Sequence, residues 1–390
     1  MAGLVRGIQA AGVLSVVSEH LSRSIPVPLR LDISFYDAYN NSSSDHAFDI
    51  LSRHAARCES LSLTVCQEQS MSHFLHQLQS RTAVLSSLKH LNFGYGPDDI
   101  SLAVLVRGAK LRTLNALALD LSWSNFRPCN FSSLQELHIF GLRGAPLGRF
   151  LECMPSLDSL ELGSLTSGFT LDKAATELAD SPVRPSNLRH LRIRSDEDCP
   201  AEAWRTLCVP HLTSLRIYFA EYPKSSVEEI SSCFFRSRTV LQKLNLPAHF
   251  DNEEVLDFVR SQPSIDELTL EYYKSRSEGT VSLKDVLSYL TLSQLEDPQN
   301  TALVPNLRRL IIEIFYPDYS FQTLPTLARD ISEMVKSRAS AGDRPPGDAG
   351  LQAFHLDFFA QDCVQDLFSE IRVLLAPLVT SGLQLRLDTC

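Results

Sequence analysis

The chain has 390 residues, more than the roughly 250 that one hydrophobic core usually accommodates, so it holds two domains or one array of repeats. Hydrophobic residues make up 44% and charged residues 21%, as in ordinary globular proteins, and no stretch approaches the ~20 apolar residues of a membrane span. The formal charge is −10 and no long run of Lys or Arg occurs, which argues against nucleic-acid binding.

Near the N-terminus, apolar residues recur at helical spacing, at Val13, Leu14, Val17 and Leu21. We interpret residues 8–21 as an amphipathic helix, although the short apolar stretch behind Arg6 also faintly resembles the core of a signal peptide. Because the ends of a repeat array must shield its apolar core from water, this helix is expected to cover the first coil. Residues 1–57 are therefore assigned to a helical cap and a first irregular coil, and residues 58–390 to the repeat array.

A short motif with the form apolar-x-x-Leu-x-apolar recurs along the rest of the chain. Most copies lie at or close to the spacing of leucine-rich repeats, about 20–29 residues, and the last two intervals imply insertions. One copy means little in a leucine-rich chain, but eleven successive copies predict leucine-rich repeats. Their middle residues are Leu61, Leu91, Leu117, Leu137, Leu160, Leu191, Leu215, Leu244, Leu268, Leu310 and Phe354.

The segments between these copies favour helices, for example over residues 226–235 and 252–260, and prolines often precede the next strand. The predicted fold class is α/β: an irregular leucine-rich-repeat solenoid with a parallel β-sheet on the concave side and helices on the convex side. Residues 338–350, rich in Gly, Pro and Ala, predict a flexible loop within the array. The leucines expected to stack as its core include Leu160, Leu191, Leu215, Leu244 and Leu268.

The nine cysteines are scattered and odd in number, with no C-x-x-C pair, so they are expected to be mostly buried, reduced thiols. A reducing compartment follows, cytoplasmic or nuclear. The nucleotide-binding, zinc-protease and serine-hydrolase motifs G-x-G-x-x-G, G-x-x-x-x-G-K-[ST], H-E-x-x-H and G-x-S-x-G do not occur. We therefore assign no catalytic residue, no metal ligand and no cofactor, and expect a protein that is not an enzyme, with an unrecognised enzyme as the least favoured alternative.

The candidate binding residues flank the inward leucines of three successive strands, so strand alternation points their side chains onto the concave face. They form a predicted basic trough of His190, Arg192, Arg194, Arg216, Tyr218 and Lys243. Acidic residues, among them Glu161 and Glu267, flank it. Two interpretations stay open: charged residues that keep an exposed face soluble, or a site for an acidic or phosphorylated peptide.

Two stretches resemble the leucine-rich part of the F-box proteins that are numerous in mushroom-forming fungi. Residues 17–33 resemble that family's helix-Arg-Ser-x-x-x-Pro-Leu-x-Leu strand, and His54-Ala-Ala-Arg57-Cys58-Glu-Ser-Leu61-Ser-Leu63 resembles its next coil. The resemblance implies the substrate-binding arm of a cullin-type ubiquitin ligase.

The F-box itself, which typically opens with Leu-Pro-x-Glu, is not evident before residue 17. A ligase adaptor is therefore expected as a partner only if an F-box lies upstream. The alternative is a repeat scaffold or receptor unconnected with ubiquitin. Either way the expected partner is a protein or peptide, and neither nucleic acid nor a membrane.

Overall fold

The structure is a computed structural model of the chain, which divides into two compact units, Met1–His211 (unit 1) and Leu212–Cys390 (unit 2). Each unit is described by itself. The described residues are 11–25, 27–35, 53–65, 85–93, 106, 108–122, 129–143, 147–163, 186–195, 204–205, 207–219, 224–247, 253–273, 283–291, 304–315, 324–339, 350–359 and 364–389.

Unit 1 alternates strands with turns and short helices. Its strands are β1 (Leu29–Phe35), β2 (Cys58–Val65), β3 (His90–Phe93), β4 (Thr113–Ser122), β5 (Glu136–Arg143), β6 (Ser159–Leu162) and β7 (His190–Ser195). Its described helices are α1 (Ala11–Arg23), the 3-10 helix η1 (Ala55–Arg57) and α6 (Leu147–Glu152).

Unit 2 alternates strands with longer helices. Its strands are β8 (Ser214–Phe219), β9 (Lys243–Pro247), β10 (Glu267–Tyr273), β11 (Arg309–Phe315), β12 (Ala353–Phe359) and β13 (Gln384–Thr389). Its helices are α9 (Lys224–Ser237), α10 (Glu253–Arg260), α11 (Leu283–Leu290), α12 (Leu324–Ala339) and α13 (Val364–Thr380). The helices predicted over 226–235 and 252–260 thus correspond to α9 and α10.

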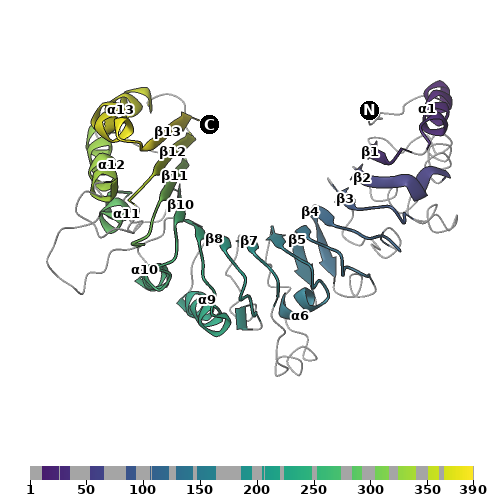
Figure 1. Ribbon diagram of the computed structural model, residues 1–390, viewed down its shortest axis with the longest axis horizontal. Helices are drawn as coiled ribbons and strands as arrows, with labels where there is room; N and C mark the ends of the chain where they lie inside the picture. The colour runs from purple at the N-terminus through teal and green to yellow at the C-terminus, as the bar shows by residue number, and fades with distance from the viewer. Residues whose placement is uncertain are drawn as a thin grey trace. The chain divides into compact units, whose positions relative to one another are not determined.

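Within each unit the strands pair in parallel and follow one another in chain order. The helices between strands pack on one side of the sheet (Figure 1). We call the opposite side of each unit's sheet its open face. The predicted fold class is confirmed, because a parallel sheet in chain order with helices on one side is the arrangement expected of a repeat solenoid.

The register corrects one predicted repeat. Leu114 pairs with Leu91 on one side and Leu137 on the other, so Leu114 and not Leu117 is the middle residue of this coil. Its following inward residue is Ala116, which is fully buried and in register with Ile139. The sequence pattern failed here because an alanine stands where the motif expects a larger apolar residue, so the leucine-rich run three residues on matched it better.

The core of each unit lies between the sheet and its outer layer. The five leucines chosen for the predicted ladder are all buried, with Leu191 the most exposed at 2%. Along a strand, buried side chains alternate with more exposed ones. In β11, for example, every second residue of Arg309–Phe315 is buried. Trp204 is fully buried, as expected for a packing residue. Alternation of this kind fixes which side chains reach the open face.

Successive coils are joined at the strand entrances by a repeated backbone arrangement. The carbonyl of Lys89 accepts hydrogen bonds from the N–H groups of both Arg112 and Thr113, at 2.7 and 3.0 Å. The carbonyls of Gln135, Asp158 and their counterparts in unit 2 accept pairs of N–H groups in the same way. The backbone therefore satisfies its own polar groups where each coil enters the sheet.

Two arginine side chains donate hydrogen bonds to backbone carbonyls at the ends of helices. In unit 1, the Arg57 guanidinium donates to the carbonyls of Leu21 and Ser24 at the end of α1, both at 2.9 Å, and to Val27 at 2.7 Å. In unit 2, Arg338 is 2% exposed and donates to the carbonyls of Leu290, the last residue of α11, and of Val304. Arginine suits this role because its fork of N–H groups reaches several carbonyls that a helix end leaves without partners.

The structure also bears on the predicted N-terminal helix, the predicted loop and the absence of a membrane-spanning helix. The N-terminal helix is present over Ala11–Arg23 with Leu21 buried, and residues 8–10 lie outside the described residues. Of the loop predicted at 338–350, Arg338 and Ala339 are the last residues of α12, and residues 340–349 are outside the description. Among the described helices, none is long and apolar enough to cross a membrane.

Candidate functional site

The six residues of the predicted trough all lie on strands of the open faces, three in each unit. His190, Arg192 and Arg194 are on β7 in unit 1, and each is exposed. Arg216 and Tyr218 on β8 are half-buried, and Lys243 on β9 is exposed. Their orientation follows from strand alternation, because the intervening Leu191, Ile193, Leu215 and Ile217 are buried.

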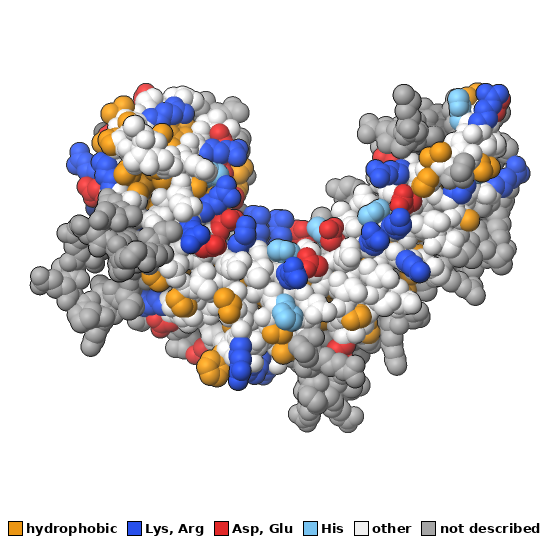
Figure 2. All heavy atoms as spheres, in the orientation of Figure 1, with side chains coloured by type: hydrophobic (Ala, Val, Ile, Leu, Met, Phe, Trp, Pro, Cys, Tyr) orange, Lys and Arg blue, Asp and Glu red, His pale blue; other side chains and the backbone are white. Residues whose placement is uncertain are grey.

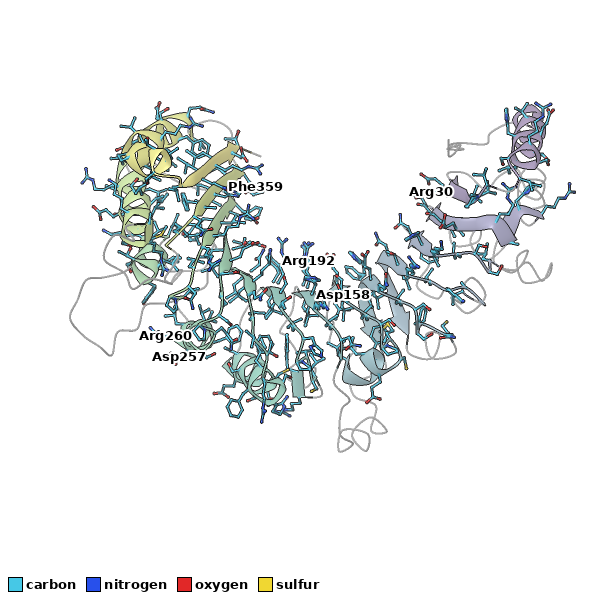
Figure 3. The ribbon with its side chains drawn as sticks, viewed as in Figure 1. Arg30, Asp158, Arg192, Asp257, Arg260 and Phe359 are labelled. Carbon is cyan, nitrogen blue, oxygen red and sulfur yellow. The ribbon has the colours of Figure 1, made fainter. Side chains whose placement is uncertain are left out.

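In unit 1 the trough residues meet acidic side chains from the preceding strand. Glu161 on β6 lies between two basic groups: its carboxylate is 3.1 Å from Nδ1 of His138 on β5 and 3.1 Å from the Arg192 guanidinium. Asp158, at the entrance of β6, is 3.4 Å from Arg189 and 3.8 Å from His190. Glu161 is in register with Arg192, which explains why the two side chains meet. Figure 3 labels Asp158 and Arg192, which project from the open face of unit 1.

In unit 2 the trough residues also meet carboxylates, here from strands later in the chain. Arg216 contacts Glu271 of β10 at 2.6 Å, and the Glu271 side chain is only 4% exposed. Lys243 contacts Glu267 at 3.0 Å, and Arg309 of β11 approaches the same carboxylate at 3.7 Å. Positive and negative side chains therefore alternate over this face, as Figure 2 shows along the open faces of both units.

These contacts define what the two halves of the trough are able to do. An acidic or phosphorylated ligand must compete with Glu161 for Arg192, and with Glu271 for Arg216. The Glu271 side chain is almost completely buried, so an exchange that leaves it without Arg216 is costly in unit 2. Arg192 is about half exposed, so its pair with Glu161 is weak and more readily exchanged.

Sequence reasoning named Glu271 beside the trough but missed three further outward acidic residues in unit 2, Glu313, Asp357 and Asp388. Glu271, Glu313, Asp357 and Asp388 stand in register on β10 to β13 and form one row across the open face. Two residues further along β11 and β12, the rings of Phe315 and Phe359 are stacked, with centroids 4.1 Å apart and planes at 13°. A signal was present, since each acidic residue follows the middle apolar residue of its coil by three positions.

Two groups in this region have shifted pKa values. Burial, followed by the positive charges of Arg309 and Arg386, lowers the pKa of His355, so its ring is neutral at pH 7. Burial, followed by the neighbouring Asp388 carboxylate, raises the pKa of Asp357. The ionised form of Asp357 is therefore less favourable in the folded protein than in water.

Two of the described cysteines have thiols that are partly or fully buried and therefore unreactive. Burial raises the pKa of Cys58 to about 12 and that of Cys129 to about 11, so neither forms a thiolate at neutral pH. Over the described residues, no group of three or more His, Cys, Asp or Glu side chains is arranged to hold a metal ion.

The fold and these surfaces define the class of protein as an α/β repeat fold with a parallel sheet, charged on its open faces. No model of a protein family matches the chain, and no curated protein matches it significantly. Among solved structures, a protein from Bacteroides fragilis determined in a structural-genomics programme covers 98% of this chain and 84% of its own, at 10% identity and a TM-score of 0.24. That likeness is too weak to carry an argument about fold or function.

Proposed function

We propose that this protein is a recognition module that binds another protein through the open faces of its sheets. The observation that carries this proposal is the alternation of side chains along strands such as β7 and β9: buried apolar residues face the core, and the polar or charged residues between them face outward. An outward side chain is able to change without disturbing the leucine ladder, so such a face adapts to a partner at little cost in stability. The six trough residues are the first candidates, with Arg192 in unit 1 the most available.

The resemblance to fungal F-box proteins gives this proposal its most specific form, the substrate-binding arm of a cullin-type ubiquitin ligase. The alternative is a receptor or scaffold unconnected with ubiquitin. The described cysteines carry free thiols, which supports a reducing location, cytoplasmic or nuclear. We propose no catalytic activity and no cofactor.

The test compares partners captured by the full chain and by charge-reversal variants, from a lysate of a mushroom-forming fungus. Arg192→Glu tests the trough in unit 1 and Arg216→Glu tests it in unit 2. The matched control is Arg260→Glu, because Arg260 lies on the outer helix α10 and pairs there with Asp257 at 2.8 Å. Figure 3 labels both residues on that helix.

The expected result is loss of a defined set of partners in a trough variant and retention of that set in the control. Thermal unfolding should be unchanged in Arg192→Glu and Arg260→Glu. Arg216→Glu should lower the melting temperature, because the nearly buried Glu271 loses its partner, so its capture is measured below that temperature. A ligase adaptor captured together with these partners supports the ubiquitin assignment, and partners without an adaptor support the alternative. Equal capture by wild type and both trough variants would remove the trough from the site.

A further inference from the structure

The stacked rings of Phe315 and Phe359 lie on the open face of unit 2, where strand alternation places mainly polar side chains on β11 and β12. Phe358, the preceding residue, is buried and contacts Phe368 of α13 with ring centroids 5.9 Å apart, so it points toward the helices. Phe359 therefore points to the opposite side of the sheet (Figure 3). Both stacked rings are half-buried, so part of their apolar surface remains in solvent. These rings supply apolar contact area beside charged side chains, a combination that a partner side chain is able to use.

The acidic row lies directly beside these rings. Glu313 and Asp357 precede Phe315 and Phe359 by two residues on the same strands, and neighbouring strands are about 4.8 Å apart. We call this surface, made of Glu313, Asp357, Asp388, Phe315 and Phe359, the acid–aromatic surface. A side chain lying on it meets ring faces and carboxylates at once.

Both ends of the acidic row form ion pairs within the protein. Arg216 pairs with Glu271 at one end, and Arg386 pairs with Asp388 at the other. His355, which precedes Asp357 by two residues, is neutral at pH 7 for the reasons given above. In the described part of the chain, no ion pair reaches Asp357. Burial and the Asp388 carboxylate raise the pKa of Asp357 and outweigh Arg386, which lowers it, so Asp357 has no direct cationic partner among the described residues.

We propose that the acid–aromatic surface binds a basic segment of a partner protein, with a Lys or Arg side chain placed between Asp357 and the ring of Phe359. Residues two apart on one strand are about 6.7 Å apart, so a cation between them lies within the ~6 Å reach of a cation–π contact and also near the carboxylate. This inference rests on the proposed function of the open face and adds the chemical class of the partner.

Charge complementarity selects this occupant over the others. An acidic segment would meet a row of carboxylates, and a purely apolar segment would bury Asp357 without a partner, which is unfavourable. The net charge of −10 also attracts a basic partner over longer distances and favours a rapid encounter. A basic segment carrying an apolar residue satisfies both the rings and the carboxylates.

The experiment measures binding of two defined peptides to the full chain, fluorescein-labelled hexalysine and hexaglutamate, by fluorescence anisotropy at low salt. Asp357→Asn removes the central charge while keeping the shape of the side chain. Phe359→Leu removes the ring face while keeping apolar volume, so it separates cation–π attraction from packing. The matched controls are Asp257→Asn on α10 and Phe235→Leu on α9, an exposed acid and a phenylalanine that is 88% exposed, both on helices of the same unit.

Hexalysine is expected to bind saturably, and any binding of hexaglutamate through the basic trough is expected to be the same in wild type and in the double variant Asp357→Asn/Phe359→Leu. Asp357→Asn should weaken hexalysine about tenfold and Phe359→Leu about threefold, as for a charge pair and a cation–π contact that are partly desolvated. Both controls should stay within about twofold of wild type, because substitutions outside a binding site leave most of its affinity intact. Thermal unfolding confirms that each variant is folded.

Two outcomes would overturn the proposal: no saturable binding of hexalysine, or equal affinity for hexalysine in wild type and the double variant Asp357→Asn/Phe359→Leu. Equal affinity would mean that hexalysine senses only the net charge of the chain. The peptide assay needs no natural partner, so its result is independent of the capture experiment. Loss of the trough's role leaves hexalysine binding intact, and failure of the acid–aromatic surface leaves capture through Arg192 intact.

Discussion

In unit 1 the described outer layer is sparse, with α1 of 13 residues and α6 of 6, whereas unit 2 places helices of 8 to 17 residues after its strands β8 to β12. Both units nevertheless stack the same inward leucines in register. The same strand pattern therefore accompanies outer helices as short as α6 and as long as α13. Helices pack against one another in unit 2, where α12 contacts both α11 and α13.

The two units also differ in how they fix the ends of helices. Arg57 in unit 1 is half-buried, and Arg338 in unit 2 is almost completely buried. The same kind of hydrogen bond should therefore be worth more in unit 2, because water is unable to replace a lost donor there. Hydrogen–deuterium exchange read by mass spectrometry distinguishes the two units, so it suits the predictions below.

The largest effect is expected from Arg338→Met. The substitution keeps much of the side-chain length but leaves the carbonyls of Leu290 and Val304 buried without this donor. Two charge-assisted bonds of this kind predict a loss of about 3–5 kcal/mol in the free energy of unfolding of unit 2. Exchange should accelerate in α11 and α12 while unit 1 is unchanged. A loss below about 1 kcal/mol would show that water or another group reaches these carbonyls.

Replacing a leucine of the ladder with alanine is expected to lower the free energy of unfolding by the same amount in the two units. Leu160→Ala in unit 1 and Leu244→Ala in unit 2 each remove a leucine that is 1% exposed at the same position of the coil. Each should cost about 2–5 kcal/mol in chemical denaturation, since a cavity remains in the ladder. The comparison fails if one of the two costs under about 0.5 kcal/mol, because that unit's core would then not depend on its leucine ladder.

A smaller effect is expected from Arg57→Ala in unit 1. Because this guanidinium is partly exposed, water replaces some of its bonds to the end of α1, and a loss of about 1–2 kcal/mol is expected. Faster exchange confined to α1 and β1 would confirm that Arg57 fastens the first coil. Arg23→Ala is the control, since Arg23 forms an exposed pair with Glu19 and its loss should cost under about 0.5 kcal/mol.

The smallest effect concerns Asp357 and depends on pH. Its raised pKa means that the native protein holds this proton more tightly than the unfolded chain does. The stability this group provides is complete below the unfolded pKa of about 3.9 and is lost as the pH rises through the raised native value. At pH 7, Asp357→Asn should therefore raise the melting temperature slightly, by less than about 2 °C.

The same variant should show no difference from wild type near pH 3, where both side chains are uncharged. Asp388→Asn is the comparison variant. Because Asp388 pairs with Arg386, removing its charge should not raise the melting temperature at pH 7. A lower melting temperature for Asp357→Asn at pH 7 would mean that the carboxylate stabilises the native protein. The acid–aromatic surface would then have no uncompensated charge at its centre.

The sequence by itself determined the fold class, the strand positions in most coils and the orientation of their side chains. It did so because burial of a strand's alternate residues is a local property, visible as Leu-x-Leu. The same reasoning placed all six trough residues on open faces. It went wrong at Leu114, where Ala116 weakens the local pattern, and it did not extend to β13, where Gly382 stands three residues before Leu385 in place of the expected apolar residue.

Only the tertiary structure decided which outward side chains meet. Arg216 and Glu271 are 55 residues apart in the chain, and their contact depends on how β9, the strand between them, sets the register of β8 and β10. The stacking of Phe315 on Phe359 and the burial of Arg338 likewise follow from the lengths and packing of connecting segments. Strand periodicity constrains the direction of a side chain but carries no information on its neighbour across the sheet, because that neighbour is set by register between distant segments.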